Sequence, residues 1–171
     1  YSNKAACYEA LGNYKQAINV YEELLGLEFT KAFTYYKIGL AYKQMKQWIP
    51  ALVSFQKSLI EDPQFYLSMM EQSNMYEEMG GMKEALYFAK EALQLNEDNV
   101  EYQKRVAYLY IDAGKFEESL VCLQKLISLE PERFYNWYAC AEVLMLLGEY
   151  KDAISLLKDA VKKHKRAELY Y

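Results

Sequence analysis

Residues that commonly carry catalysis or bind metals are sparse in this chain, and their spacing matches no familiar site. His164 is the only histidine, and no cysteine or second histidine lies beside it to complete a zinc site. The three cysteines, Cys7, Cys122 and Cys140, show no CxxC spacing. The phosphate-loop, dinucleotide-loop and nucleophile-elbow motifs GxxxxGKS/T, GxGxxG and GxSxG are absent from the sequence. These observations predict no metal site, no cofactor and no nucleophilic catalysis.

Paired carboxylates are the remaining candidates for acid–base catalysis, and they occur at residues 22–23, 77–78 and 117–118. Adjacent side chains on a helix point about 100° apart, so the two carboxylates of each pair diverge. We interpret them as solvated surface charges and predict that the chain is not an enzyme.

Composition places the chain among folded proteins, because 53% of its 171 residues are apolar and 26% are charged. A net charge of −4 argues against binding to nucleic acid, which requires clustered lysine and arginine. The one dense basic run, at 162–166, falls where the last helix is expected to end, and cations are favourable there. No apolar stretch approaches the ~20 residues needed to span a bilayer, so we expect no direct membrane insertion.

The cysteines bear on the cellular compartment. Cys122 and Cys140 lie among apolar residues at helical spacing, which indicates small buried side chains. The odd number of thiols predicts no disulfide framework, which fits a reducing compartment and favours a cytoplasmic location. The first residue is Tyr1 rather than methionine, so the location stays open, and a periplasmic one would follow from removal of a signal peptide.

A repeated phrase dominates the sequence. GNYKQAI at 12, GGMKEAL at 80, GKFEESL at 114 and GEYKDAI at 148 share one pattern, and KQWIPAL fills the same slot at 46. Each start lies 34 residues after the one before it, so one unit occurs five times without an insertion. A fixed period of this size indicates a repeat architecture.

Each unit predicts two amphipathic helices joined by a short turn. Within residues 32–65, apolar side chains recur at steps of three or four over 35–45 and again over 48–59, as on one face of a helix. Glycine precedes the turn in four units, which suits a left-handed residue at a helix C-terminus, and Lys46 replaces it in the second unit. Small residues fill two further columns and let helix axes approach closely. These columns are Ala5, Gly39, Ser73, Ala107 and Ala141, and Ala17, Ala51, Ala85, Ser119 and Ala153.

The chain resembles the tetratricopeptide repeat family over its whole length. The resemblance rests on the period of 34, the turn glycines, the small columns, prolines at 63 and 131, and a tyrosine column of Tyr8, Tyr42, Tyr76 and Tyr110. It implies an all-α fold, a right-handed α-solenoid of antiparallel helix pairs. Departures are local, since Lys4 and Gln72 stand where an apolar residue is usual and Gln103 takes an aromatic slot.

The repeats are expected to form a single array over residues 1–171. Their approximate limits are 1–31, 32–65, 66–99, 100–133 and 134–167, and residues 168–171 are expected to start a further helix. Solenoids usually carry polar capping helices, and neither end shows one. We therefore interpret the chain as an excerpt from a longer array or a larger protein.

In this family the first helices of successive units line a concave groove, so the resemblance implies that their outward face is the binding surface. That face carries tyrosine, methionine, leucine and isoleucine among single charges, and exposed apolar surface often marks a binding site. The expected partner-binding residues are Tyr36, Leu40, Lys43, Met70, Asn74, Glu77, Lys104, Tyr108, Ile111, Tyr135, Tyr138, Glu142 and Met145. We expect Lys37, Lys104 and Arg105 to favour acidic ligand residues and Glu71, Glu77 and Glu142 to favour basic ones.

Two specialised binding modes of the family do not fit this sequence. The carboxylate clamp of co-chaperones needs lysine, asparagine and arginine at slots that hold Tyr36, Leu40, Glu71, Glu101 and Arg105 here. The asparagine ladder of the sugar-transferase arrays is also missing, because its column reads Asn3, Lys37, Glu71, Arg105 and Ala139.

The sequence thus predicts a non-catalytic scaffold that binds a peptide or helix of a partner protein in its concave groove. An alternative is that the chain is the regulatory or sensor arm of a larger enzyme or signalling protein whose active domain lies outside this segment. Self-association through the uncapped ends is a third hypothesis. The identity of the partner is not encoded in any motif.

Overall fold

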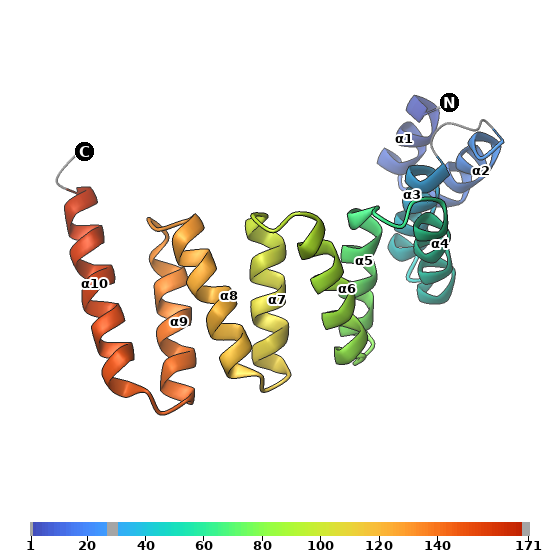
Figure 1. Ribbon diagram of the computed structural model, residues 1–171. Helices are drawn as coiled ribbons and strands as arrows, with labels where there is room; N and C mark the ends of the chain where they lie inside the picture. Colours follow the sequence, from blue (N-terminus) through green and yellow to red (C-terminus); the bar gives the residue numbers. More distant parts are fainter. Residues whose placement is uncertain (1, 27–30, 169–171) are drawn as a thin grey trace. The chain divides into compact units, whose positions relative to one another are not determined.

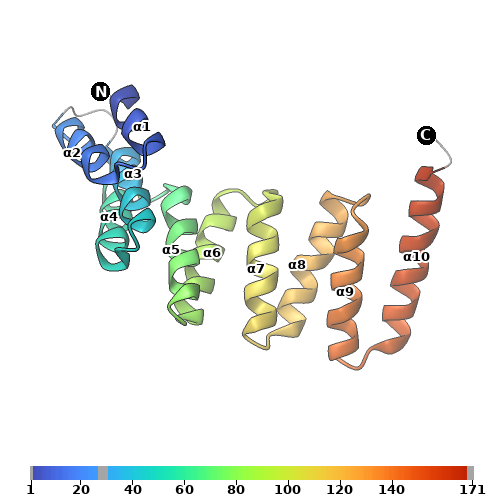
Figure 2. The same ribbon diagram turned by 180° about the vertical axis from the view of Figure 1, so that it is seen from behind.

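The computed structural model describes the backbone of residues 2–26 and 31–168, and the side chains of residues 3–26 and 31–163. These residues form ten helices and no strand (Figures 1 and 2). The helices are α1 (Ser2–Ala10), α2 (Tyr14–Leu24), α3 (Lys31–Gln44), α4 (Trp48–Glu61), α5 (Tyr66–Glu78), α6 (Met82–Leu95), α7 (Val100–Asp112), α8 (Phe116–Leu129), α9 (Phe134–Leu146) and α10 (Tyr150–Glu168).

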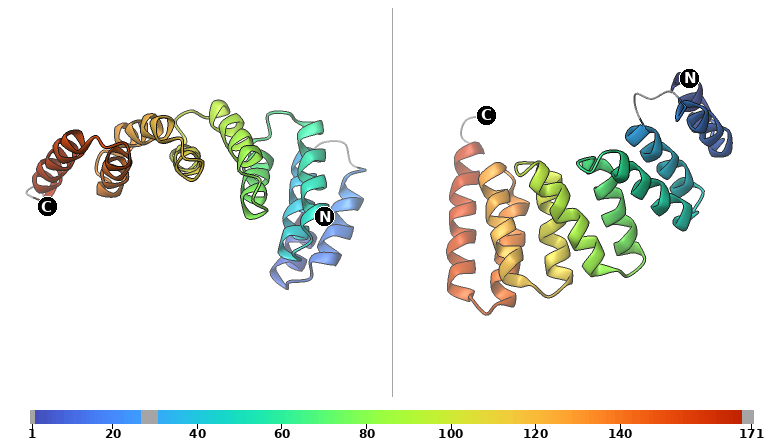
Figure 3. Two further views of the ribbon diagram at one scale, coloured as in Figure 1. Left: turned by 90° about the horizontal axis from the view of Figure 1, so that it is seen from below. Right: turned by 45° about the vertical axis from the view of Figure 1, so that its right-hand side comes forward.

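Each repeat predicted from the sequence contains one pair of helices, and the fold is all-α as predicted. The pairs group into two compact units, unit 1 (residues 1–95, α1–α6) and unit 2 (residues 96–171, α7–α10). Within each unit, a helix packs against its neighbours in the chain (Figure 3). The continuity of the five pairs as a single array stays a prediction. At the C-terminus, α10 runs to Glu168, and the remaining residues of the expected further helix, 169–171, lie outside the described residues.

The turn inside every pair has the left-handed residue that the glycine column predicts. The backbone φ angle is 70° at Gly12, 80° at Gly80, 69° at Gly114 and 80° at Gly148, and Lys46 adopts 57° in the remaining turn. In each turn, the next residue donates its backbone N–H to the carbonyl five residues earlier, as Asn13 does to Tyr8 at 2.8 Å. This bond is characteristic of a Schellman motif. The same turn motif therefore reverses the chain direction in all five pairs.

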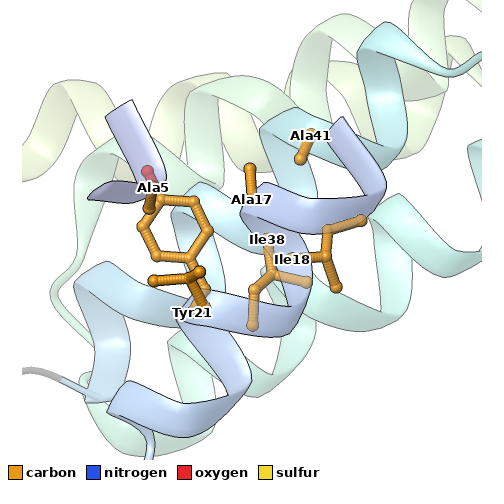
Figure 4. Close-up of a cluster of buried hydrophobic side chains, with 7 residues drawn as sticks. Ala5, Ala17, Ile18, Tyr21, Ile38 and Ala41 are labelled. Carbon is orange, nitrogen blue, oxygen red and sulfur yellow. The ribbon is translucent and has the colours of Figure 1, made fainter. Parts of the chain in front are cut away.

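The small columns are buried where helices meet. Ala17, Ala51, Ala85 and Ser119 are fully buried. Figure 4 shows the cluster around α2, in which Ile18 and Tyr21 lie beside Ile38 of α3. A Cβ atom added to Gly39 would lie 2.5 Å from the ring of Phe55, so only glycine lets α3 approach α4 this closely.

The two buried glutamines that break the apolar pattern differ in their surroundings. Gln103 in unit 2 donates its amide to the backbone carbonyl of Cys122 at 3.2 Å. Gln72 on α5 is fully buried, and neither amide atom has a hydrogen-bond partner among the described residues. An unpaired buried amide costs free energy, so Gln72 is a local weakness of unit 1.

Candidate partner-binding faces

The predicted binding residues lie on the first helices of the pairs, α3 and α5 in unit 1 and α7 and α9 in unit 2. We call their outward sides the α3–α5 face and the α7–α9 face. The predicted residues of the α3–α5 face are Tyr36, Leu40, Lys43, Met70, Asn74 and Glu77, and all are half-buried. Those of the α7–α9 face are Lys104, Tyr108 and Ile111, which are half-buried, and Tyr135, Tyr138, Glu142 and Met145, which are exposed.

Tyr36 on the α3–α5 face belongs to an aromatic cluster. Its ring centroid lies 6.1 Å from that of Phe33, 6.0 Å from that of Phe55 and 5.6 Å from that of Phe65. These distances are typical of packed aromatic pairs. Burial, with the nearby Glu71 carboxylate and Tyr66, raises the pKa of the Tyr36 hydroxyl. Tyr36 therefore packs within unit 1 and is half-buried there.

Two ion pairs join the first helices of unit 1. Lys37 on α3 contacts Glu9 on α1 at 2.8 Å, and Lys43 on α3 contacts Glu71 on α5 at 2.7 Å. Both pairs join residues 28 apart, and all four side chains are about three-quarters buried or more. The prediction that Lys37 and Glu71 select the charge of a ligand is therefore not supported, because each is already paired.

Tyr21 completes one of these pairs. Its pKa is raised by burial and by the Glu9 carboxylate, to which its hydroxyl is hydrogen-bonded. The Lys37 ammonium lies 6.0 Å from the centre of the Tyr21 ring. Tyrosine, glutamate and lysine thus form a closed Tyr21–Glu9–Lys37 triad. A cavity of about 280 Å³ opens beside it, lined by Glu9, Tyr14, Lys37, Leu40, Ala41 and Gln44.

The α7–α9 face is more open. Tyr135 is 62% exposed, Tyr138 44% and Met145 43%. These residues and Glu142 are spaced by three, four and three along α9, so they form one stripe on the helix surface. The stripe is the largest exposed aromatic feature on the predicted binding residues.

Hydrogen bonds link the tyrosines of the α7–α9 face. The hydroxyl of Tyr108 on α7 is hydrogen-bonded to that of Tyr135 on α9, and burial together with this bond raises the pKa of Tyr108. The hydroxyl of Tyr138 donates to the Glu142 carboxylate, which raises the pKa of Tyr138. The Glu142 carboxylate also acts on Tyr108 through its charge. Three tyrosines therefore gather around one carboxylate, and we call this set the Tyr–Glu cluster.

Lys104, also on this face, forms ion pairs with two glutamates of unit 2. Its ammonium lies 3.1 Å from Glu101 and 3.6 Å from Glu130. The prediction that Lys104 attracts an acidic ligand is therefore weakened. Among the described residues, no lysine or arginine is paired with Glu142.

A further exposed apolar surface lies on α10, and the sequence analysis did not identify it. Ile154 is 55% exposed and Val161 42%, and with Leu157, Lys158 and Lys162 they line an open cavity of about 470 Å³. Ile18, four repeats earlier, is only 5% exposed, because it is packed in the cluster that includes Ile38 of α3. A comparison of Ile154 with its repeat equivalents could have raised the question of what covers α10. Only the structure shows which of these positions are covered.

Cys122 and Cys140 are buried, as the sequence predicts, Cys7 is exposed, and the three thiols are unbonded. Among the described residues, no three histidine, cysteine, aspartate or glutamate side chains gather to hold a metal ion. None of the helices in the described part is long and apolar enough to cross a membrane.

Known proteins share both the repeat and the fold. The chain matches the tetratricopeptide repeat family over residues 28–170, and a second description of the same repeat matches residues 1–33. The chain belongs to the tetratricopeptide repeat family, as its sequence pattern predicts.

Among curated proteins, the chain is 29% identical over 161 residues to the TPR repeat-containing protein YpiA of Bacillus subtilis. The match covers 91% of this chain and 36% of YpiA, so the chain spans about a third of that relative's length.

Among solved structures, a crystal structure of MamA superposes with a TM-score of 0.79 at 17% identity, over 100% of this chain and 99% of MamA. A structure described as "YrrB: a TPR protein with an unusual peptide-binding site" gives a TM-score of 0.75 at 20% identity, over 95% of this chain and 84% of YrrB. MamA from Desulfovibrio magneticus gives 0.74 at 16% identity, over 96% and 93% of the two chains. These similarities confirm the fold as an all-α solenoid of the family.

Proposed function

We propose that the chain is a non-catalytic scaffold that holds a peptide or helix of a partner protein against the first helices of its repeats. The α7–α9 face is the main contact surface. The observation that carries this proposal is the exposed stripe of Tyr135, Tyr138, Glu142 and Met145 on α9. Tyrosine and methionine are enriched in protein interfaces, and exposed apolar surface of this kind commonly marks a binding site.

Two further observations support a peptide as the ligand. The related fold of YrrB is described as having a peptide-binding site. The stripe on α9 is also an open helix face. An extended segment or a short helix can bury the whole length of such a stripe. A small metabolite would leave most of the stripe exposed to solvent.

The test uses a displayed library of short random peptides selected against the whole chain. The wild-type chain should enrich peptides with apolar anchors, and Tyr135→Ala combined with Tyr138→Ala should weaken their binding roughly tenfold or more. Tyr150→Ala is the matched control, because Tyr150 is equally exposed on α10 but lies outside both faces. Equal binding by the double variant and the control would move the site away from the α7–α9 face.

A second proposed function follows from the length of the relative YpiA. Because the chain spans about a third of YpiA, we also propose that it serves as the interaction arm of a longer protein. Binding by this arm would then recruit or regulate an activity located elsewhere. The scaffold proposal and this one make the same prediction for the α7–α9 face, and the sequence of the whole protein distinguishes them.

Association through α10 is a separate proposal, favoured by its exposed apolar side. A helix packed against Ile154 and Val161 would cover Ile154, whose equivalents Ile18 and Leu86 are buried in unit 1. If the occupant is a second copy of this chain, light scattering should show a mass that rises with concentration, and Ile154→Lys should abolish the rise. A monomeric mass at every concentration would exclude a second copy.

A further inference from the structure

We infer that the Tyr–Glu cluster, formed by Tyr108, Tyr135, Tyr138 and Glu142, binds a lysine or arginine side chain of the partner segment. This inference rests on the proposed function and adds the chemistry of the ligand: a basic residue bound beside apolar anchors.

Charge is the first argument. Several charged side chains of the described chain are held in ion pairs, as Glu9 is with Lys37 and Lys104 with Glu130. Glu142 is exposed, forms no ion pair among the described residues, and lies on the same stripe of α9 as the exposed Tyr135 and Tyr138. A carboxylate beside exposed apolar side chains is complementary to a cation and repels an anion. The ligand side chain at this point is therefore basic.

Aromatic geometry is the second argument. A lysine or arginine cation is attracted to the face of a tyrosine ring when it lies within about 6 Å of the ring centre. Tyr135 is 62% exposed and Tyr138 44%, and they lie two turns and one turn before Glu142 on the same side of α9.

Unit 1 contains the same arrangement with its cation in place, which is the strongest argument. In the Tyr21–Glu9–Lys37 triad, the tyrosine hydroxyl is bonded to the carboxylate. The lysine lies 2.8 Å from the carboxylate and 6.0 Å from the ring centre. Tyr138 and Glu142 repeat the tyrosine–carboxylate half of this triad without the lysine. The chain also places Lys57 over Tyr35 and Lys163 over Trp137, at 5.6 and 5.8 Å, so pairing cations with rings is a recurrent feature of its surface.

The alternative of an acidic ligand does not fit the same face. Lys104 lies one helical turn before Tyr108 on α7, and it is held between Glu101 and Glu130. An acidic ligand would have to displace these contacts and would meet the Glu142 carboxylate. A basic ligand needs no such rearrangement.

The experiment compares peptide selections by the wild-type chain and by three variants, using a displayed library of short random peptides as the probe. The wild-type chain should enrich lysine or arginine at one position next to apolar residues. Glu142→Gln should bind the selected peptides roughly tenfold more weakly and should no longer enrich a cation, while it still enriches the apolar positions. Glu142→Lys should favour aspartate or glutamate at that position. Asp152→Asn, an exposed acid on α10, is the control and should select like the wild type.

The outcomes distinguish a failure of this inference from a failure of the proposed function. Apolar enrichment that depends on Tyr135 and Tyr138 without any enriched cation would overturn the inference and leave the scaffold proposal standing. A cation preference that persists in Glu142→Gln would also overturn it. If the wild-type chain enriches no peptide at all, the proposed function fails, and the inference fails with it.

Discussion

The α3–α5 face of unit 1 and the α7–α9 face of unit 2 are built from the same repeat positions, yet they have opposite character. Tyr36 and Tyr138 are equivalent, because they lie 102 residues apart, which is three periods of 34. Tyr36 is packed among three phenylalanine rings, whereas Tyr138 is 44% exposed and hydrogen-bonded to Glu142. One repeat position therefore serves packing in one unit and is available for recognition in the other.

The charges differ in the same way. In unit 1, lysines and glutamates 28 residues apart neutralise one another between successive first helices. In unit 2, the corresponding positions of α7 and α9 are Ile111 and Ala139, which form no ion pair. The difference teaches that composition alone does not show which tyrosines and glutamates the chain packs or pairs and which it leaves exposed.

The largest expected effect is on the packing of unit 1. Phe55 is fully buried, contacts Tyr36 and lies against Gly39. Phe55→Ala should destabilise the chain by about 3–5 kcal/mol, because it removes a large buried ring and leaves a cavity. Chemical denaturation followed by circular dichroism measures this change. A loss below about 1 kcal/mol would show that the aromatic cluster does not stabilise unit 1.

The next prediction compares the two equivalent tyrosines directly. Tyr36→Ala should destabilise the chain by about 1–3 kcal/mol, because it removes packed aromatic contacts. Tyr138→Ala should cost less than about 0.5 kcal/mol, as is usual for exposed positions. Denaturation curves of the two variants under identical conditions test the contrast. Equal losses would mean that the two faces do not differ as described.

Replacing the unpaired amide of unit 1 should increase stability. Gln72→Met keeps the side-chain volume and removes two buried polar atoms without partners, so the free energy of unfolding should rise by about 1–2 kcal/mol. Gln103→Met is the matched change in unit 2 and should lower stability, because Gln103 is hydrogen-bonded to the Cys122 carbonyl. A gain or a loss in both variants would contradict this reading of the two glutamines.

The last prediction concerns alkaline pH and unit 2. Burial raises the pKa of the Cys140 thiol from 9.0 to about 11. The unfolded chain releases this proton near pH 9 and the folded chain near pH 11, so this contribution is complete below pH 9 and is lost as the pH rises toward 11. Under reducing conditions, Cys140→Ala should show a shallower loss of stability between pH 9 and 11 than the wild type. Cys7→Ala, at an exposed thiol, should keep the wild-type slope.

Much of the fold could be predicted from the sequence because it is encoded locally. The period of 34, the turn glycines and the small columns each act within one or two helices, and the structure confirms the left-handed turns, including the one at Lys46. Even the weak point at Gln72 was visible as a polar residue in an apolar column. The sequence could not show that its amide is unpaired, because that depends on which atoms of neighbouring helices face it.

The site could be predicted only as a set of positions. Repeat spacing placed thirteen residues on one kind of face, but exposure depends on neighbours that belong to other repeats. Tyr36 is covered by Phe33, Phe55 and Phe65, and no column of the repeat requires phenylalanine at all three positions. The ion pairs at a separation of 28 could have been found by searching for opposite charges between adjacent first helices, whereas the open side of α10 required the structure.

Nuclear magnetic resonance of the isotope-labelled chain, titrated with a peptide selected from the library, is the most direct test of the central claim that the α7–α9 face is the recognition surface. The account predicts that shift changes concentrate on Lys104, Tyr108, Ile111 and the α9 stripe from Tyr135 to Met145. It also predicts smaller changes around the packed residues Tyr36 and Lys43. Changes concentrated on the second helices, or on Tyr36 and its neighbours, would contradict it.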